Sequence, residues 1–193
     1  MGLDIYVKRI YKNPPKKFNT VEEVNNFLNK NDIYHFSIDD QHELKDVFKK
    51  HIRTIPVQFY DFEETFKILG LDYQYYYLGN TLYKQNSLYT FYNDDGKELT
   101  IKESELTVKI EYEDVLFAYN TGKGYQCRGQ NYNFYSYFQN LDQYCFARKK
   151  TILEIYKKCF HGKDFDGDKL EIKFKRNIID NFTPGSDIVV FSY

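Results

Sequence analysis

The stretch SLYTFYNDDGKELTI, residues 87–101, does most to decide the fold class. Two runs rich in aromatic and β-branched residues flank Asn93-Asp94-Asp95-Gly96, a turn-forming tetrapeptide, and this order is typical of an antiparallel β-hairpin. The next segment, ELTVKIEYEDVLFAY (residues 105–119), could be one or two further strands, although its acidic first part could begin a short helix. The sequence of the central part of the chain therefore predicts an antiparallel sheet.

Short helices and strands are expected before this hairpin. Thr20, Asp40 and Asp61 are each followed three residues later by Glu, a capping-box pattern that predicts three helix starts. Gly70 is a suitable end for the third helix because glycine readily adopts the left-handed backbone of a C-terminal cap. Residues 3–7, 33–38 and 55–60 are expected to be strands, the first of them ended by the two prolines of YKNPPKK.

The C-terminal part is expected to contain one longer helical segment and two strands. Residues 130–160 have apolar side chains at helical spacing, as one helix or as two helices broken near Asn140. KLEIKFK (169–175) and DIVVFSY (187–193) show the alternation or the apolar run of strands. We therefore predict a single α+β domain, residues 1–193, with a largely antiparallel sheet, several short helices and one longer helix in the C-terminal half.

Aromatic residues make up 19% of the 193-residue chain, with 20 Tyr, 17 Phe and no Trp. A tyrosine ring favours burial whereas its hydroxyl needs a hydrogen-bond partner, so many tyrosines are expected at the rim of the core or on a binding surface. Codon bias in an AT-rich genome would also raise the tyrosine content, and the sequence does not separate the two explanations.

The sequence excludes several classes of protein. It contains no apolar run long enough to span a membrane and does not begin like a signal peptide, so we expect a cytoplasmic location and no membrane partner. Its three cysteines, Cys127, Cys145 and Cys159, are too widely spaced for CxxC zinc chemistry. Asp164-Phe-Asp-Gly-Asp168 departs from a calcium loop at later positions and is expected to be a turn. We predict no catalytic residue, no metal site and no cofactor.

The stretch TGKGYQCRGQNYNFYSYF, residues 121–138, is the strongest candidate for a ligand loop. Its glycines would let the backbone approach an anion, its cations would contact phosphate, and its rings would stack on a base. The alternative is a flexible connection followed by an aromatic core helix. The residues expected to bind the ligand are Gly122, Lys123, Gly124, Tyr125, Arg128, Asn131 and Tyr132.

The opening MGLDIYV resembles a group of small phage and prophage proteins of uncharacterised function that begin Met-Gly-Leu-Asp-Met-Tyr. Many of those proteins carry a later Tyr-Trp-Arg-Lys-Ala-Asn-x-x-His-x-Trp-Phe type of segment. Here YQCRGQNYNFYSYF keeps Arg128 and Asn131 at the matching interval and has Phe134 in place of the histidine. The resemblance implies an origin in a phage or mobile element, whose proteins often bind a host factor or a host signalling molecule.

Charge is unevenly distributed along the chain. Residues 61–120 contain twelve Asp and Glu against five Lys and Arg, although the net charge of the whole chain is −1. The leading hypothesis is a non-enzymatic binding protein, for example a counter-defence factor, whose partner is a nucleotide or a single-stranded nucleic acid. The alternatives are a protein–protein inhibitor that presents the Tyr-rich acidic residues 72–114 to a basic host protein, and a nucleotide-processing enzyme.

Overall fold

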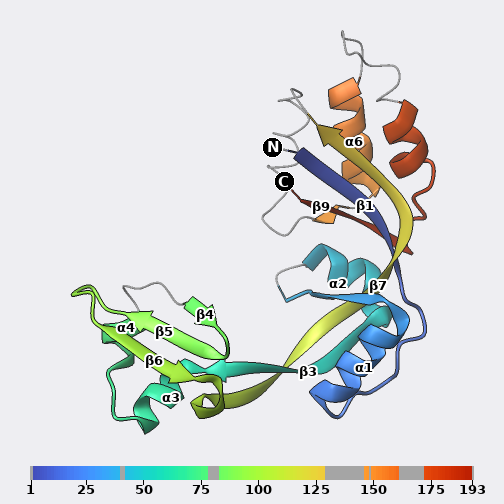
Figure 1. Cartoon of the computed structure of the whole chain (residues 1–193). Helices are drawn as coiled ribbons and strands as arrows, with labels where there is room; N and C mark the ends of the chain where they lie inside the picture. The colour runs from blue at the N-terminus through green and yellow to red at the C-terminus, as the bar shows by residue number, and fades with distance from the viewer. Residues whose placement is uncertain are drawn as a thin grey trace. The chain divides into compact units, whose positions relative to one another are not determined.

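The computed structural model describes residues 2–39, 42–77, 83–128, 146–147, 149–160 and 172–192. These residues fall into two compact units, which we call unit 1 (Met1–Ile55 with Glu113–Tyr193) and unit 2 (Pro56–Tyr112). Both units combine antiparallel strands with short helices, so the predicted α+β class is confirmed (Figure 1). The organisation of residues 1–193 as one domain stays a prediction.

The helices and strands follow one another in an irregular order typical of the α+β class. In chain order they are β1 (Gly2–Ile10), α1 (Val21–Asn31), β2 (Ile33–Ser37), α2 (His42–Phe48), the 3₁₀ turn η1 (Lys49–His51), β3 (Ile52–Asp61), α3 (Phe62–Ile68), α4 (Tyr73–Tyr77), β4 (Tyr83–Gln85), β5 (Leu88–Tyr92), β6 (Glu98–Lys102), the 3₁₀ turn η2 (Glu103–Glu105), β7 (Thr107–Arg128), β8 (Phe146–Ala147), α6 (Lys149–Phe160), the π-helical turn η3 (Lys175–Ile179) and β9 (Asp187–Ser192).

The sheet of unit 1 is built around β7 and β1. Its strand order is β2-β7-β1-β9-β8, and β3 also pairs with β7. β1 runs antiparallel to β7 from the pair Gly2–Arg128 to the pair Ile10–Ala118, and the register shifts between Val7 and Lys8. On its other edge β1 pairs antiparallel with β9. The predicted first and last strands are therefore confirmed, and the chain's two ends meet in neighbouring strands.

Two clusters of apolar side chains cover the sheet of unit 1. The first packs α6 and the segment 172–182 against β1, β9 and the end of β7; its fully buried members include Ile5, Val7 and Phe174. The second packs α2 against Ile10, Leu116 and their neighbours. Residues 115–118 of β7 have no exposed surface. The rings of Phe18 and Phe27 pack against Phe117 on one face of the strand, and α2 covers the other face.

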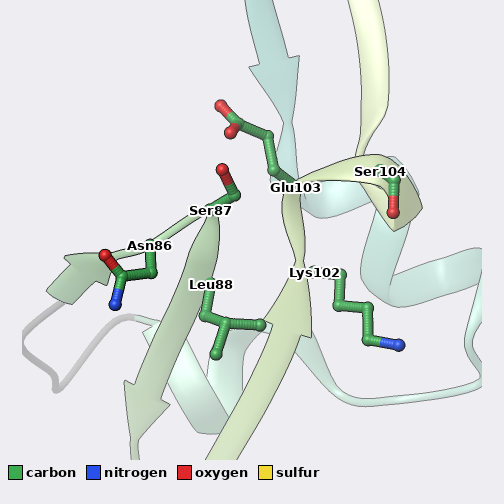
Figure 2. A pocket seen from close by; sticks show the side chains of 6 residues that line it. All are labelled: Asn86, Ser87, Leu88, Lys102, Glu103 and Ser104. Carbon is green, nitrogen blue, oxygen red and sulfur yellow. The ribbon is translucent and has the colours of Figure 1, made fainter.

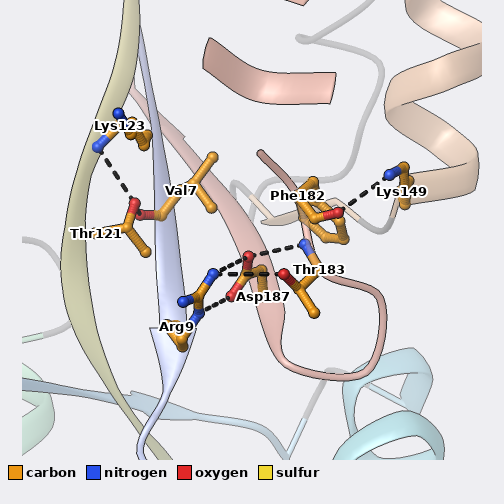
Figure 3. Close-up of polar contacts among 8 residues, drawn as sticks. All are labelled: Val7, Arg9, Thr121, Lys123, Lys149, Phe182, Thr183 and Asp187. Atoms are coloured by element: carbon orange, nitrogen blue, oxygen red, sulfur yellow. Dashed lines mark hydrogen bonds and ion pairs between the residues drawn. The ribbon is translucent and has the colours of Figure 1, made fainter. Parts of the chain in front are cut away.

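One buried ion pair joins β1 to β9 in the same unit. Arg9 Nε lies 2.8 Å from Asp187 Oδ1, and the Asp187 side chain is fully buried. The second carboxylate oxygen accepts from the backbone N–H of Thr183 at 2.9 Å and from Arg9 Nη2 at 3.1 Å (Figure 3). The Asp187 carboxylate is thus neutralised and fully hydrogen-bonded, which is what makes its burial tolerable.

Two of the three predicted helix starts are confirmed. Thr20 Oγ1 accepts from the N–H of Glu23 at 3.2 Å, and Asp61 Oδ1 accepts from the N–H of Glu64 at 2.9 Å, so each caps its helix as expected. Asp40, the third predicted cap, lies outside the described residues. Gly70 ends α3 with a φ of +67°, as predicted.

Unit 2 contains the predicted hairpin. β5 and β6 pair antiparallel from Leu88–Lys102 to Tyr92–Glu98, and β4 adds a third strand on the other edge of β5. Asn93 Oδ1 accepts from the N–H of Lys97 at 2.7 Å and closes the turn. The core beneath this sheet is largely aromatic; its buried members are Phe66, Tyr76, Tyr89, Phe91, Ile101 and Leu106.

The C-terminal part differs from the prediction in two respects. Residues 172–175, the described part of the strand expected at 169–175, are helical and begin a helical segment that extends to Ile179, because Phe174, Ile178 and Ile179 are the buried residues and their spacing is that of a helix. The predicted longer helix is also wrong for the described residues: α6 has 12 residues and α1 has 11. The predicted helical residues 130–145 and the predicted turn at 164–168 lie outside the described residues.

Candidate functional site

The predicted ligand loop begins as a strand. Residues 121–128 form the end of β7, and residues 123–128 pair with β1, so Gly122, Lys123 and Gly124 belong to a strand of the sheet rather than to a loop. The backbone of Arg128 pairs with Gly2. Asn131 and Tyr132, and the side chain of Arg128, lie outside the described residues.

Gly122 lies in a bulge whose backbone amides are already bonded. It has a φ of +71°, at the point where the β1–β7 register shifts. Its N–H donates to Asn120 Oδ1 at 3.0 Å, and the N–H of Lys123 donates to Thr121 Oγ1 at 3.2 Å. Thr121 Oγ1 in turn donates to the carbonyl of Val7 at 2.6 Å (Figure 3). These amides therefore already have hydrogen-bond partners within the strand, and the ligand role expected of Gly122 and Lys123 stays a prediction.

Gly124 and Tyr125 serve packing. A Cβ on Gly124 would lie 2.9 Å from Tyr6 Cδ1 and 3.0 Å from the carbonyl oxygen of Ile5, so glycine is needed for the close approach of β1 and β7. The Tyr125 side chain is 2% exposed, and its ring meets that of Phe174 edge to face, with centroids 5.2 Å apart. A ring buried in this way does not present a face to a base, which weighs against the stacking role expected of Tyr125; that role stays a prediction.

A surface hollow of about 600 Å³ lies beside the β4–β5 turn of unit 2. Its lining comes from that turn and from the start of η2; the residues are Asn86, Ser87, Leu88, Lys102, Glu103 and Ser104 (Figure 2). Asn86 and Ser87 have φ values of 50° and 61°, the left-handed conformation that a two-residue hairpin turn requires. Tyr60 Oη donates to Glu103 Oε1 at 2.5 Å, and Lys84 Nζ donates to the same oxygen at 2.7 Å.

The ionisable groups at this hollow are poorly suited to proton transfer. The hydrogen bonds from Lys84 and Tyr60 lower the pKa of Glu103 to about 2. The bond to Glu103 raises the pKa of Tyr60 and that of Lys84. Since an efficient general acid or base has a pKa near the working pH, all three shifts are in the wrong direction for catalysis near neutrality. This cluster instead ties β3, β4 and η2 together.

The described residues of unit 1 contain a smaller hollow of about 200 Å³ between α2, the start of α6 and the loop before β9. Most of its lining is apolar. Two of its three charged groups have partners: Lys149 Nζ donates to the carbonyl of Phe182 at 3.0 Å, and Asp187 is held by Arg9 (Figure 3). Nothing in this hollow selects a ligand.

The most distinctive surface is a row of exposed apolar side chains on β7. Val108, Ile110 and Tyr112 are 46%, 54% and 68% exposed. Because side chains alternate across a strand, these three share one face of β7; we call them the apolar stripe. Their exposure is unusual, since a strand with this alternation normally buries its apolar face.

The opposite face of the same strand is polar. Lys109 Nζ lies 2.9 Å from Glu111 Oε1 and 5.6 Å from the ring centroid of Phe59 on β3. The hydrogen bond to Glu111 raises the pKa of Lys109, so this lysine stays charged and paired. The two faces of β7 therefore differ: one carries a neutralised ion pair and the other carries the apolar stripe.

Exposed apolar side chains and negative charge are both concentrated in unit 2. Eight of the twelve large apolar side chains that are exposed among the described residues belong to it: Phe59, Ile68, Leu69, Tyr75, Leu88, Val108, Ile110 and Tyr112. Unit 2 also contains ten Asp and Glu against five Lys and Arg, a net charge of −5, whereas the whole chain has −1. The combination is typical of a surface that binds a protein.

Tyrosine contributes less to this surface than its abundance suggested. Tyr76 and Tyr89 are buried in the core of unit 2, and Tyr73 packs against it. Tyr75 is exposed and donates to Asp95 Oδ2 at 2.6 Å. Tyr73, Tyr76 and Tyr89 therefore support unit 2 from within its core, and the acidic binding surface expected of residues 72–114 stays a prediction.

Metal and membrane sites are not found among the described residues. No group of three His, Cys, Asp or Glu within them could hold a metal ion. None of their helices is both long and apolar enough to cross a bilayer. No family model, curated protein or solved structure matches this chain.

Proposed function

We propose that the chain is a non-enzymatic binding protein whose unit 2 binds a basic surface of another protein, with the apolar stripe at the centre of the contact. The observation that carries the proposal is the exposure of Val108, Ile110 and Tyr112 on one face of β7. This proposal is the protein–protein alternative given in the sequence analysis, except that the centre of the interface is the apolar stripe and not the tyrosines of residues 72–114.

The chemistry of unit 2 supports a protein as the partner. Binding apolar side chains on a strand requires complementary apolar surface, which another protein supplies at the centre of an interface. The net charge of −5 on unit 2 repels phosphate and favours a partner rich in lysine and arginine. A partner of this kind would associate faster at low ionic strength, since opposite charges guide the encounter.

The resemblance to phage proteins supports a host protein as that partner, and inhibition of a host defence factor as the outcome. The burial of Tyr125, one of the two tyrosines expected to stack on a base, weighs against the nucleotide hypothesis. The roles predicted for Arg128, Asn131 and Tyr132 stay predictions. Nucleotide processing gains no support, because the clustered ionisable groups around Glu103 have pKa values displaced from neutrality.

Photo-crosslinking inside host cells tests the proposal. Benzoylphenylalanine placed at Tyr112 is expected to form one dominant adduct with a protein whose exposed surface is basic. The matched control is the same replacement at Tyr34 of unit 1, which is 43% exposed and not part of the stripe. Equal adducts at both positions, or none at Tyr112 under conditions in which the protein is folded and abundant, would contradict the proposal.

A further inference from the structure

A cluster of cations lies on unit 1. It combines the loop after β1 with the turn between α2 and β3: Lys12 and Lys50 are exposed, and His51 and Arg53 are half-buried. We call Lys12, Lys50, His51 and Arg53 the basic cluster. Sequence analysis did not predict it because the two segments are about forty residues apart.

The fold brings the two segments together through the core. Ile10, the last residue of β1, and Ile52, the first of β3, both pack against the cluster formed by Leu116 and Phe48. The N–H of Tyr11 donates to the carbonyl of Phe117 at 2.8 Å, which fixes the chain immediately before Lys12.

The η1 turn is held by Arg53. Its Nη1 donates to the carbonyl of Lys50 at 3.2 Å and to that of Ile52 at 2.9 Å. The backbone that carries these cations is therefore fixed by packing and hydrogen bonds. Little conformational entropy of the backbone would be lost when the cations bind a ligand.

These cations are not neutralised within the described part of the chain. No ion pair there involves Lys12, Lys50, His51 or Arg53, whereas Arg9, Lys45, Lys84 and Lys109 each have a carboxylate partner. The other three cations lie close enough to His51 to affect it: the pKa of His51 is lowered first by burial and then by the charges of Lys50, Arg53 and Lys12. Like charges held together without counter-charges favour the binding of an anion.

The composition of the cluster favours phosphate over an acidic protein. A surface that binds another protein has few lysines at its centre, and the apolar or aromatic side chains found there are exposed before binding. Here two of the four cations are lysines, and no large apolar side chain of residues 11–17 or 49–53 is among those exposed. Phosphate contacts, in contrast, come mainly from lysine and arginine and need no apolar partner.

We propose that the basic cluster of unit 1 binds the phosphate backbone of a nucleic acid without reading its bases. This site is separate from residues 121–138, where a nucleotide was expected, and it does not depend on the protein-binding role of unit 2. Three of its groups, Lys12, Lys50 and Arg53, are the lysine and arginine side chains that commonly contact phosphate. They set the number of phosphates that the site neutralises.

Fluorescence anisotropy with labelled DNA of about 20 nucleotides, single-stranded and duplex, tests the proposal between about 50 and 200 mM salt. Three phosphate contacts predict that log K falls with log salt with a slope of about −2 for the single strand and about −3 for the duplex. The double variant Lys12→Ala/Lys50→Ala is expected to bind about tenfold more weakly at the lowest salt and to retain a slope of about −1. Arg53 is left unchanged because it holds the η1 turn.

The matched control is Lys30→Ala/Lys157→Ala, which removes the same charge from exposed lysines of α1 and α6. It is expected to bind like the wild type. Equal losses in both double variants would show a general charge effect and overturn the site. Absence of binding to either DNA at low salt, or tighter binding of poly-glutamate of matched length, would overturn the nucleic-acid assignment. Circular dichroism and thermal melting of each variant verify that the fold is intact.

Discussion

Tyr125→Ala is expected to lower the free energy of unfolding by about 3 to 5 kcal/mol, the range for removal of a large buried aromatic side chain. The ring is 2% exposed and packs edge to face on Phe174, which is itself fully buried. Removing it leaves a cavity among the rigid elements β1, β7 and α6, where neighbouring side chains can relax only in part. Urea denaturation followed by circular dichroism measures the change.

Two variants make this result interpretable. Tyr125→Phe keeps the ring and is expected to cost much less than the alanine variant. Tyr112→Ala removes the same side chain from a position that is 68% exposed and is expected to change stability by less than about 0.5 kcal/mol. If Tyr125→Ala were as stable as Tyr112→Ala, Tyr125 would not be a core residue and a ligand role at residue 125 would be open again.

Phe66→Ala is expected to cost about 3 to 5 kcal/mol within unit 2. Phe66 has no exposed surface. The centroid of its ring lies 5.0 Å from that of Phe91, 5.4 Å from that of Tyr73 and 5.9 Å from that of Tyr76. It therefore joins α3 and α4 to the three-stranded sheet. Amide hydrogen exchange in β5 and β6 measures this effect on unit 2 itself.

The control for this prediction is Phe59→Ala, since Phe59 belongs to the same unit and is 37% exposed. We expect it to accelerate exchange in β5 and β6 only slightly. Similar acceleration in the Phe59→Ala and Phe66→Ala variants would contradict the assignment of Phe66 as the centre of the unit 2 core.

Local patterns in the sequence predicted local structure well. The β5–β6 hairpin was predictable because Asn93 and Gly96 close its turn with their own backbone and side-chain preferences. The helix caps at Thr20 and Asp61 were predictable because capping is decided within four residues. These features depend on neighbours in the chain and not on what packs against them.

Features that depend on distant contacts were not predictable. Gly122 and Gly124 suggested a loop, yet one forms a bulge and the other permits close contact with Tyr6 on a strand more than a hundred residues away. Residues 170–174 alternate like a strand in the sequence, but residues 172–179 are helical. The helix is favoured because it buries Phe174, Ile178 and Ile179 against the sheet. Here tertiary packing overrides local preference.

The candidate surface was only partly predictable. Residues 105–119 were expected to be one or two strands, with a short helix as the alternative for their acidic first part, and a strand with alternating apolar residues ordinarily has one buried face. Nothing in the sequence reveals that no described element covers Val108, Ile110 and Tyr112. The basic cluster was hidden for a related reason, since its parts meet only when β1 and β3 pack on the same core.

Calorimetric titration of the partner captured at Tyr112 tests the central claim most directly. Ile110→Lys places a charge in the middle of the apolar stripe and is expected to weaken binding by about 2 kcal/mol, roughly thirtyfold. Ile172→Lys, the matched control, introduces the same charge at an isoleucine of similar exposure, 60% against 54%, in unit 1. The account predicts that only Ile110→Lys weakens binding. Unchanged affinity for Ile110→Lys, or equal losses in the two variants, would contradict it.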